Sequence, residues 1–365
     1  MGSDRTGGSR SNVGVNPPVV HFSTSFKPKS DPPEPFSLSD LRAHASAKGF
    51  IDGDTDQAEY FLGRISYQHA SGYFKLFQNE DGALADDASL MMVHRAVLFD
   101  RKLQSLLMEY IGLFELQFRA QYSYRLSEER GAFAHRNPKN FKDAKHFKDF
   151  LNSYEREFRI QMKNNNADVI RAFDVYGDVP TWQAVEMMSF GTLSKMYSNT
   201  RSKTVRSGVA MSFGVTVEEL VSWARAISSV RNQCAHFGQL CGKPLVSRPK
   251  RIAGASGDNG SVFYIVMLLV RLLGGNRFFP DDKTLSYGTM MLASAVRLFD
   301  EFSDVSERCG IPEDWRELIT QREVVGVDVV VRTAKKGLIA TVRRMMRGNP
   351  VLSIVDSTGA ERPMA

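Results

Sequence analysis

The feature that most constrains this chain is a long run of apolar residues between Asp87 and Glu129, which recur at steps of three and four positions. An α-helix makes one turn in 3.6 residues, so this spacing places the apolar side chains on one side of a helix. These residues are Leu90, Val93, Val97, Leu103, Leu106, Leu107, Tyr110, Phe114 and Phe118. Gly131 follows the run, and glycine commonly ends a helix. The sequence therefore predicts one very long helix here.

Helical spacing continues through most of the chain from Ser37 onward. Strand signals are scarce, because the β-branched residues of Gly326–Val331 run on into a basic helical pattern. We therefore predict an all-α protein with one helical core. The further predicted helices are Asp143–Lys163, Thr181–Ser198, Val262–Leu273 and Thr284–Phe302.

Shifts in composition divide the chain into three predicted segments. Residues 1–37 are rich in proline, glycine and serine and lack an apolar pattern, which predicts a flexible tail. Residues 38–320 hold the helical patterns and form the predicted domain. Residues 321–365 form a basic C-terminal extension.

Composition also narrows the class of protein. Hydrophobic residues make up 42% and charged residues 24%, as in soluble globular proteins. The longest apolar run, Val262–Val270, is far shorter than the roughly 18 residues of a membrane span, and the N-terminus lacks the apolar segment of a signal peptide. Cys234, Cys241 and Cys309 are too few and too scattered for a disulfide framework or a cysteine zinc site. We expect a cytoplasmic protein without a membrane partner.

The clearest local signal lies in the segment Thr216–Phe237. Thr216 and Glu219 have the spacing of a capping box, which predicts the start of a helix. Five apolar residues fall within an arc of about 80° and form the predicted core face of this helix. They are Leu220, Trp223, Ile227, Val230 and Cys234.

The opposite side of this predicted helix is polar. Asn232 and His236 lie one helical step of four apart, beside Arg225 and Ser229, and Arg231 lies at the boundary of the two faces. An imidazole, an amide and a guanidinium therefore line one exposed flank.

These three groups suit the cleavage of RNA without a metal. Attack by the neighbouring 2′-hydroxyl needs a group with a pKa near 7 to move protons, which a histidine supplies. An arginine can hold the phosphate as negative charge builds, and an asparagine can orient either group. One helix offers one histidine, so a mechanism with two proton transfers suggests that two copies meet in a dimer. The alternative is a solvated helix end, where His and Arg side chains cap the last carbonyls.

The sequence of this flank also resembles a known family. Arg231 to Leu240 reads R-N-Q-C-A-H-F-G-Q-L and resembles the R-N-x-C-A-H-x-x-R-L signature of the Abi-like proteins, named for phage abortive infection, within the HEPN superfamily. Other stretches resemble blocks of the family in the same order, so that the similarity covers about residues 38–300. They are I-S-Y-Q-H-A-S-G-Y-F at Ile65–Phe74, F-D-R-K-L-Q at Phe99–Gln104, F-E-L-Q-F-R-A-Q at Phe114–Gln121 and V-P-T-W-Q-A-V-E-M-M-S-F-G-T-L-S at Val179–Ser194.

The resemblance implies a fold and an activity. It implies a HEPN-like helical bundle with extra helices, in which Arg231, Asn232 and His236 fall on a catalytic R-x-x-x-x-H motif. It further implies a metal-independent endoribonuclease without cofactors, acting as a homodimer in phage defence or as a toxin with an RNA or protein antitoxin. Two departures, Gln239 in place of an arginine and Gln68-His69-Ala70 in place of an R-L pair, concern substrate preference more than fold.

Other residues invite separate expectations. Glu115 and Arg119 are one helical step apart and should form an ion pair, which by the resemblance is a candidate support for the active site. We expect Trp182 in the core, Glu186 as a structural hydrogen-bonding group and Cys234 as a small packed residue. We expect core positions for the methionines, including Met91, Met92, Met187, Met188, Met290 and Met291.

Two basic stretches are candidate RNA-binding elements, and Arg225 on the motif helix is a further candidate. The net charge of +6, from 47 basic and 41 acidic residues, favours a polyanionic partner without requiring one. The stretch that precedes the motif helix holds Lys195, Arg201, Lys203 and Arg206. The C-terminal stretch, which equally suits a membrane-surface, partner-binding or plain solvated helix, holds Arg332, Lys335, Lys336, Arg343, Arg344 and Arg347.

The same residues are compatible with two other functions. A non-catalytic RNA-binding protein would use the same flank and the basic stretch to hold a small RNA or antitoxin RNA. A helical interaction module would use its surface for a protein partner. His69, His94, His135 and His146 show no paired metal-ligand spacing, so no metal site is predicted.

Overall fold

The computed structural model describes residues 35–50, 55–79, 81–275 and 286–325, and the backbone of two short strands beyond them. The α-helices are α1 (Leu38–Ala47), α2 (Thr55–Arg64), α3 (Tyr67–Ser71), α4 (Leu90–Arg130), α5 (Ala144–Lys163), α6 (Ala167–Tyr176), α7 (Thr181–Met187), α8 (Phe190–Asn199), α9 (Lys203–Ser212), α10 (Val217–Ala235), α11 (Val262–Leu273), α12 (Tyr287–Glu301), α13 (Trp315–Ile319) and α14 (Arg322–Val325). The short 3-10 helices are η1 (Phe74–Phe77), η2 (Ala134–Arg136) and η3 (Pro138–Asn140), and the strands are β1 (Ser353–Val355) and β2 (Glu361–Pro363). The protein is all-α in class, as predicted.

The predicted long helix is confirmed as α4, which has 41 residues. It begins where Ser89 Oγ accepts a hydrogen bond from the Met92 amide, and it ends at Gly131, whose φ of +86° few other residues adopt. The predicted apolar positions are buried along one side of α4, apart from the half-buried Leu106.

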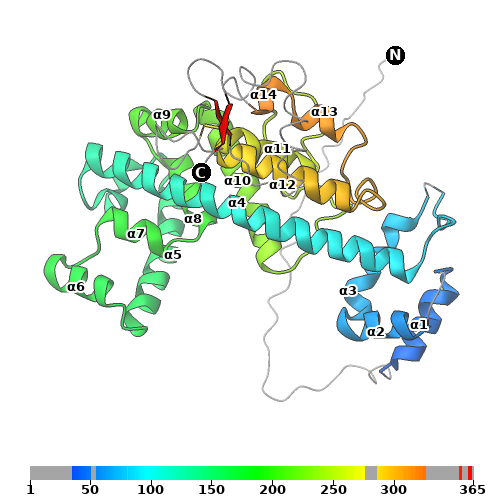
Figure 1. The fold of residues 1–365 in the computed structure, drawn as a ribbon. Helices are drawn as coiled ribbons and strands as arrows, with labels where there is room; N and C mark the ends of the chain where they lie inside the picture. Colours follow the sequence, from blue (N-terminus) through cyan, green and yellow to red (C-terminus); the bar gives the residue numbers. More distant parts are fainter. Residues whose placement is uncertain are drawn as a thin grey trace, which may run out of the picture.

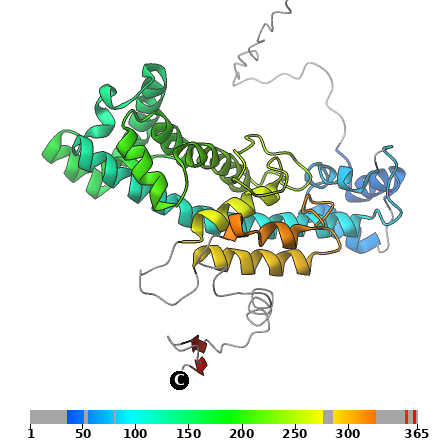
Figure 2. The same ribbon diagram turned by 90° about the horizontal axis from the view of Figure 1, so that it is seen from above.

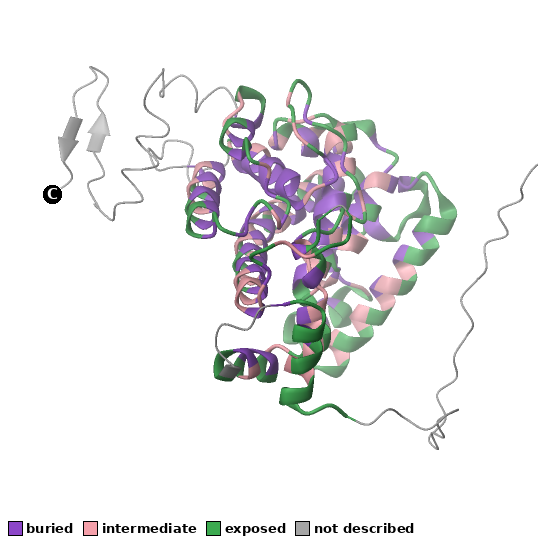
Figure 3. Cartoon of the chain, turned by 90° about the vertical axis from the view of Figure 1, so that its right-hand side faces the viewer, coloured by how far each residue is buried: buried purple, intermediate pink, exposed green. Residues whose placement is uncertain are grey.

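The other helices pack around α4 (Figure 1). Helices α1 to α3 lie at its N-terminal end, α10 to α12 lie along its middle, and α5 to α8 lie toward its C-terminal end. The view from above shows the same order along α4 (Figure 2). Buried residues gather on the sides of the helices that face one another (Figure 3). The long helix therefore places segments that are far apart in sequence side by side.

Helix α11 lies at the centre of the core. All of its residues are buried except the partly exposed Arg271, as expected for a helix that is apolar on every side. It packs against α12, where a Cβ atom at Gly288 would lie 2.5 Å from the Val270 carbonyl oxygen and 2.7 Å from the backbone of Gly274. Only glycine allows so close an approach of the two backbones.

One predicted helix proves to be two. The expected helix Thr181–Ser198 is broken at Met188 and Ser189, which adopt extended conformations with ψ values of 142° and 153°. The Ser189 side chain accepts a hydrogen bond from the Thr192 amide and so starts α8 anew. Apolar spacing continues across the break, and for this reason the periodic pattern did not reveal it.

Three expectations for single residues were wrong. Trp182 is 48% exposed, because Thr181, Ala184 and Val185 fill the buried side of the short α7. Glu186 is exposed, and its carboxylate makes no hydrogen bond within the described part of the chain. Met290 and Met211 are also exposed, whereas Met91, Met92, Met187, Met188 and Met291 are buried or half-buried as expected.

The C-terminal region carries a feature that was not predicted. Strands β1 and β2 pair antiparallel, with Ser353 opposite Pro363 and Val355 opposite Glu361. The segment Gly326–Val331 lies outside the described residues, as does most of the predicted N-terminal tail. Among the described helices, none is long and apolar enough to cross a membrane.

Candidate functional site

The motif helix α10 forms as predicted. Thr216 and Glu219 make the capping box: the Glu219 amide donates to Thr216 Oγ1 at 3.2 Å, and the Thr216 amide donates to Glu219 Oε2 at 2.8 Å. The five predicted core residues of this helix, from Leu220 to Cys234, are all buried. This packing fixes the rotation of α10 and leaves its polar flank facing outward.

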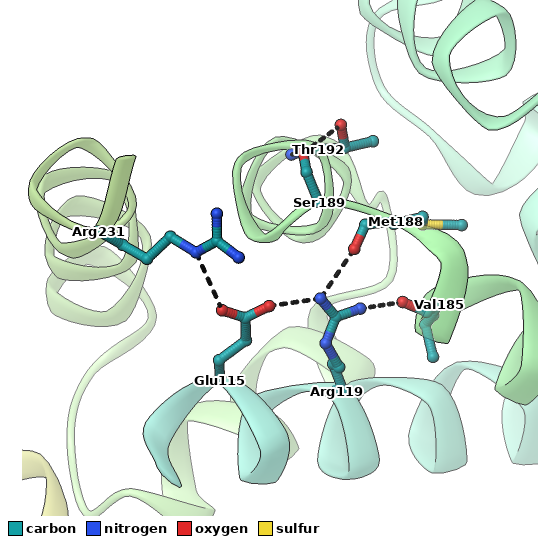
Figure 4. Close-up of polar contacts among 7 residues, drawn as sticks. All are labelled: Glu115, Arg119, Val185, Met188, Ser189, Thr192 and Arg231. Atoms are coloured by element: carbon teal, nitrogen blue, oxygen red, sulfur yellow. Dashed lines mark hydrogen bonds and ion pairs between the residues drawn. The ribbon is translucent and has the colours of Figure 1, made fainter. Parts of the chain in front are cut away.

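Arg231 is held by a carboxylate of the long helix (Figure 4). Its Nε atom lies 3.8 Å from Oε2 of Glu115, and its side chain stays 34% exposed. The other oxygen of Glu115 accepts a hydrogen bond from Arg119, one turn further along α4. Glu115 therefore bridges two arginines, one partly exposed and one buried.

Arg119 links this carboxylate to the break between α7 and α8. Its guanidinium donates to the carbonyl oxygens of Val185 and, at 2.8 Å, Met188, which lie at the end of α7 and at the break (Figure 4). A buried arginine with three acceptors is well compensated for the loss of water. The elements Phe114–Gln121 and Val179–Ser194 thus meet at Arg231 through one chain of polar contacts.

The first turn of α8 lies beside the same cluster. Figure 4 shows Ser189 and Thr192 above Glu115 and Arg119, with Arg231 reaching in from the left. Helix α8 also packs closely on α10, because a Cβ atom at Gly191 would lie 3.2 Å from Ser228 Oγ. The positive end of the α8 dipole and the guanidinium together favour negative charge at this position.

Asn232 and His236 are exposed, as the helical spacing predicted. His236 is the C-cap of α10, and its amide donates to the Asn232 carbonyl oxygen at 3.1 Å. Its imidazole therefore stands at the end of the helix, where it can meet a substrate. The structure places Arg231, Asn232 and His236 in the last two turns of one helix.

Sequence analysis missed the residues that hold the loop after the motif. Arg101 Nη2 donates to the Phe237 carbonyl oxygen at 2.9 Å, and Gln104 Nε2 donates to the Gly238 carbonyl oxygen at 2.9 Å. Asp100 Oδ2 accepts a hydrogen bond from the Leu240 amide at 3.0 Å. One turn of α4 thus binds three residues of the loop 237–240, which we call the clamped loop. The only sequence signal for these contacts was the family-like block Phe99–Gln104.

A second family-like block, Ile65–Phe74, closes on the same loop. The Tyr73 hydroxyl donates to Asp100 Oδ2 at 2.6 Å, and a Cβ atom at Gly72 would lie 2.8 Å from Gln239 Oε1. Gln239 is itself held, because its Nε2 donates to the Cys241 carbonyl oxygen at 2.9 Å. Gln239, which stands where the resembling signature has an arginine, is therefore half-buried and held by these contacts.

His69, from the other departure, lies near Arg101. Partial burial, together with the positive charge of Arg101, lowers the pKa of His69 below the ordinary histidine value. The ring of His69 lies 5.7 Å from that of Tyr73.

Cys234 is a packed residue of the α10 core face, as predicted. It is 4% exposed, and burial raises the pKa of its thiol to about 12. A thiol that stays protonated at neutral pH is a poor nucleophile.

The basic stretch before α10 lies apart from His236. Gly191, in the first turn of α8, packs against Ser228 in the second half of α10. Tyr197, near the end of α8, lies close enough to Glu218 in the first turn of α10 for this carboxylate to raise its pKa, so the two helices run antiparallel. The stretch therefore lies near the start of α10, one helix length from His236. Lys195 and Lys203 are exposed there, and Arg225 is exposed on α10 itself.

Two arginines of this stretch have structural contacts. Arg201 donates to the Phe141 carbonyl oxygen at 2.8 Å, and Arg206 is half-buried. Burial and the charge of Arg206 lower the pKa of the neighbouring Lys142. The six basic residues from Arg332 to Arg347 lie outside the described residues.

The histidines considered as metal ligands lie on different elements and differ in exposure. Within the described ranges, no three His, Cys, Asp or Glu side chains gather in a group that could hold a metal ion. His135 is buried against Thr181 and Tyr154, whereas His146 is exposed on α5.

Comparison with known proteins points to the same stretch of chain. Residues 60–241 match the family model of the Abi-like proteins. This part runs from α2 to just beyond the clamped loop, and it includes the Glu115–Arg119–Arg231 cluster and His236. No curated protein and no solved structure matches the chain significantly.

Proposed function

We propose that this protein is an endoribonuclease that cleaves RNA without a metal ion and acts in phage defence by abortive infection. The observation that carries the proposal is that the Abi-like match, over residues 60–241, contains an arginine fixed by a carboxylate within two turns of an exposed histidine. An arginine and a histidine so placed are the two groups that phosphodiester cleavage by a 2′-hydroxyl requires.

Each residue has a role in this reaction. His236 moves protons, because imidazole is the side chain that both accepts and donates them near neutral pH. Arg231 stabilises the charge that develops on the phosphate when the 2′-oxygen attacks and the 5′-oxygen leaves. Asn232 positions the phosphate or the imidazole by hydrogen bonds. The products would carry a 2′,3′-cyclic phosphate and a 5′-hydroxyl.

Glu115 and Arg119 act as positioning residues. The Glu115 carboxylate restricts the guanidinium of Arg231 to one region, and Arg119 in turn fixes Glu115. A guanidinium that is already oriented loses less conformational freedom when the phosphate binds. The remaining nitrogens of Arg231 are available for the substrate.

The two proton transfers call for a second histidine. In the proposal, the exposed flanks of two copies meet, and one His236 removes the 2′ proton while the other protonates the leaving 5′-oxygen. A two-fold dimer supplies both groups without further residues.

Cleavage of labelled RNA by the purified protein in excess EDTA tests the proposal. We expect fragments that end in a 2′,3′-cyclic or 3′-phosphate. His236→Ala should abolish cleavage. The variant should still fold, because the His236 side chain is exposed. His146→Ala is the matched control, since His146 is an exposed histidine on α5 and its loss should leave cleavage unchanged.

Three outcomes would contradict the proposal. RNA binding without cleavage would favour the non-catalytic RNA-binding protein. A strict need for Mg²⁺ with 3′-hydroxyl products would indicate another mechanism. Cleavage by His236→Ala at the rate of the parent protein would remove this histidine from the reaction.

A further inference from the structure

Phe237, the residue directly after His236, combines two unfavourable features. Its φ of +54° lies in the left-handed region, and its side chain is 70% exposed. Asn165 is the other described residue besides the glycines with a positive φ, and asparagine tolerates this conformation well. A bulky phenylalanine does not, and packing gives no reason for a phenylalanine on the surface.

The surrounding contacts hold Phe237 in this conformation. Its amide donates to the Cys234 carbonyl oxygen at 3.1 Å, and its own carbonyl oxygen accepts from Arg101 Nη2 at 2.9 Å. The next residue, Gly238, is bound on both sides, by the Gln233 carbonyl oxygen at 2.8 Å and by Gln104 Nε2 at 2.9 Å. Strained residues that are over-determined in this way are concentrated at functional sites.

The chemistry around the ring is specific. The Arg101 guanidinium lies 5.5 Å from the centroid of the Phe237 ring, within the range of a cation–π contact. The ring therefore has a cation close by and remains largely exposed to solvent. His236 adjoins it in sequence, and Arg231 lies in the preceding turns of α10.

We propose that Phe237 is a stacking platform for an unpaired base of the RNA, next to the phosphate that Arg231 and His236 engage. This inference rests on the proposed function and adds that the substrate is single-stranded at the cleavage site. A base in a duplex is already stacked and paired, so only an unpaired base can lie on a protein ring. The positive charge of Arg101 beside the ring, with Arg231 in the preceding turns of α10, complements the phosphates that flank such a base.

The strain supplies a test that separates binding from folding. Phe237→Gly removes the ring and also relieves the left-handed backbone, because glycine adopts a positive φ without cost. We expect its urea midpoint to equal or exceed that of the parent protein while RNA binding weakens. Loss of one stacked base should weaken binding about 5- to 150-fold. Phe237→Tyr keeps the ring and should bind like the parent.

Binding is measured with uncleavable 2′-O-methyl oligonucleotides of about ten nucleotides. The matched control is Tyr176→Ala, which removes an aromatic residue of similar exposure, 62%, at the end of α6. A second set of oligonucleotides lacks one base at each position in turn. If Phe237 stacks on a base, one abasic oligonucleotide binds the parent more weakly than the intact oligonucleotide does. Phe237→Gly, which has already lost this contact, binds the same abasic oligonucleotide and the intact one with equal affinity.

The outcomes separate this inference from the proposed function. Binding that depends on Phe237 without any cleavage would support the platform and overturn the nuclease. Cleavage with a Phe237→Gly variant that binds like the parent would overturn the platform and leave the nuclease. Equal affinity of the parent for duplex and single-stranded RNA would also overturn the platform. So would a Phe237→Gly variant that changes its oligomeric state and keeps its RNA affinity, because Phe237 would then be a protein contact.

Discussion

At the scale of single residues, the candidate site depends on one carboxylate shared by two arginines. Glu115 and Arg119 have side-chain exposures of 13% and 9%, so their charges lie largely out of water, whereas Arg231 is one-third exposed. The two contacts of Glu115 therefore differ in how far they are shielded from water. The Glu115–Arg119 contact is a buried ion pair that supports the fold. The Glu115–Arg231 contact holds a partly exposed arginine, which in the proposed reaction binds the phosphate.

Glu115→Gln should affect both stability and cleavage. The change leaves the buried Arg119 without its counter-charge, and breaking a buried ion pair costs about 3 kcal/mol of unfolding free energy. Arg231 also loses its anchor, so kcat should fall more than KM rises. Urea unfolding and cleavage kinetics measure these effects.

Glu186→Gln is the control for this change, because Glu186 is exposed and its unfolding free energy should change by less than about 0.5 kcal/mol. A double-mutant cycle of Glu115→Gln with Arg231→Ala should show strong non-additivity in kcat. Additive losses would mean that Glu115 does not act through Arg231.

At the scale of elements, two irregular points determine where the site forms. The break at Met188 and Ser189 presents carbonyl oxygens to Arg119, and the loop after α10 is bound by Asp100, Arg101 and Gln104. Neither point belongs to a regular periodic pattern. Both are held by α4, so this helix aligns the end of α10 with the start of α8.

His135, which joins η2 to α7 through Thr181, should make the stability of the fold depend on pH. Thr181 Oγ1 donates to the Ala132 carbonyl oxygen at 2.8 Å, so it accepts from His135 Nδ1 at 3.0 Å. His135 Nε2 is then unprotonated, buried, and without a partner among the described residues. Burial lowers the pKa of His135 to about 4, compared with 6.5 for an ordinary histidine.

Protonation of His135 therefore favours the unfolded chain. Below pH 6.5 the unfolded state takes up a proton that the folded state refuses until about pH 4, so stability falls as the pH falls through this window. The full loss corresponds to about 3 kcal/mol of unfolding free energy. Urea unfolding at a series of pH values measures it, with His135→Phe as the comparison.

His135→Phe removes the titrating group and keeps a ring against Tyr154, whose centroid lies 5.0 Å from that of His135. Its stability should depend less on pH between about 6.5 and 4 than that of the parent protein. Identical pH profiles for the two proteins would show that His135 titrates alike in the folded and unfolded states. His146→Phe, at an exposed position, should leave the profile unchanged.

At the scale of the whole molecule, sequence patterns predicted the helices better than their junctions. The run from Leu90 to Phe118 has to bury one face, and this requirement alone specifies α4 and its end at Gly131. The same logic gave the buried and polar sides of α10. Trp182 was misplaced because hydrophobicity alone does not say which side of a seven-residue helix faces the core.

The site was predictable only in part. The capping box and the helical spacing predicted the positions of Arg231, Asn232 and His236 on α10, because all three belong to the end of this one helix. Arg101 and Phe237, which are in contact, lie 136 positions apart in the sequence, and Glu115 and Arg231 lie 116 positions apart. Such contacts follow from how α4 packs, which no local pattern contains.

We expect two copies of the chain to share one active site. One flank of α10 presents a single His236, whereas cleavage needs one proton removed at the 2′-oxygen and one delivered at the 5′-oxygen. If two flanks meet across a two-fold axis, each dimer has one composite site with two histidines. A dimer with one wild-type chain and one His236→Ala chain then lacks half of its only site.

Mixed dimers, purified with two different affinity tags, distinguish a composite site from independent ones. Independent sites would leave the mixed dimer with half of the parent rate, because one intact site remains. A composite site should leave far less than half. We also expect the rate per chain to fall on dilution to concentrations at which light scattering detects monomers, since dilution separates the two histidines. A monomer that cleaves RNA at the full rate would show that one chain carries out both proton transfers, and the second group would then have to come from the residues around the clamped loop.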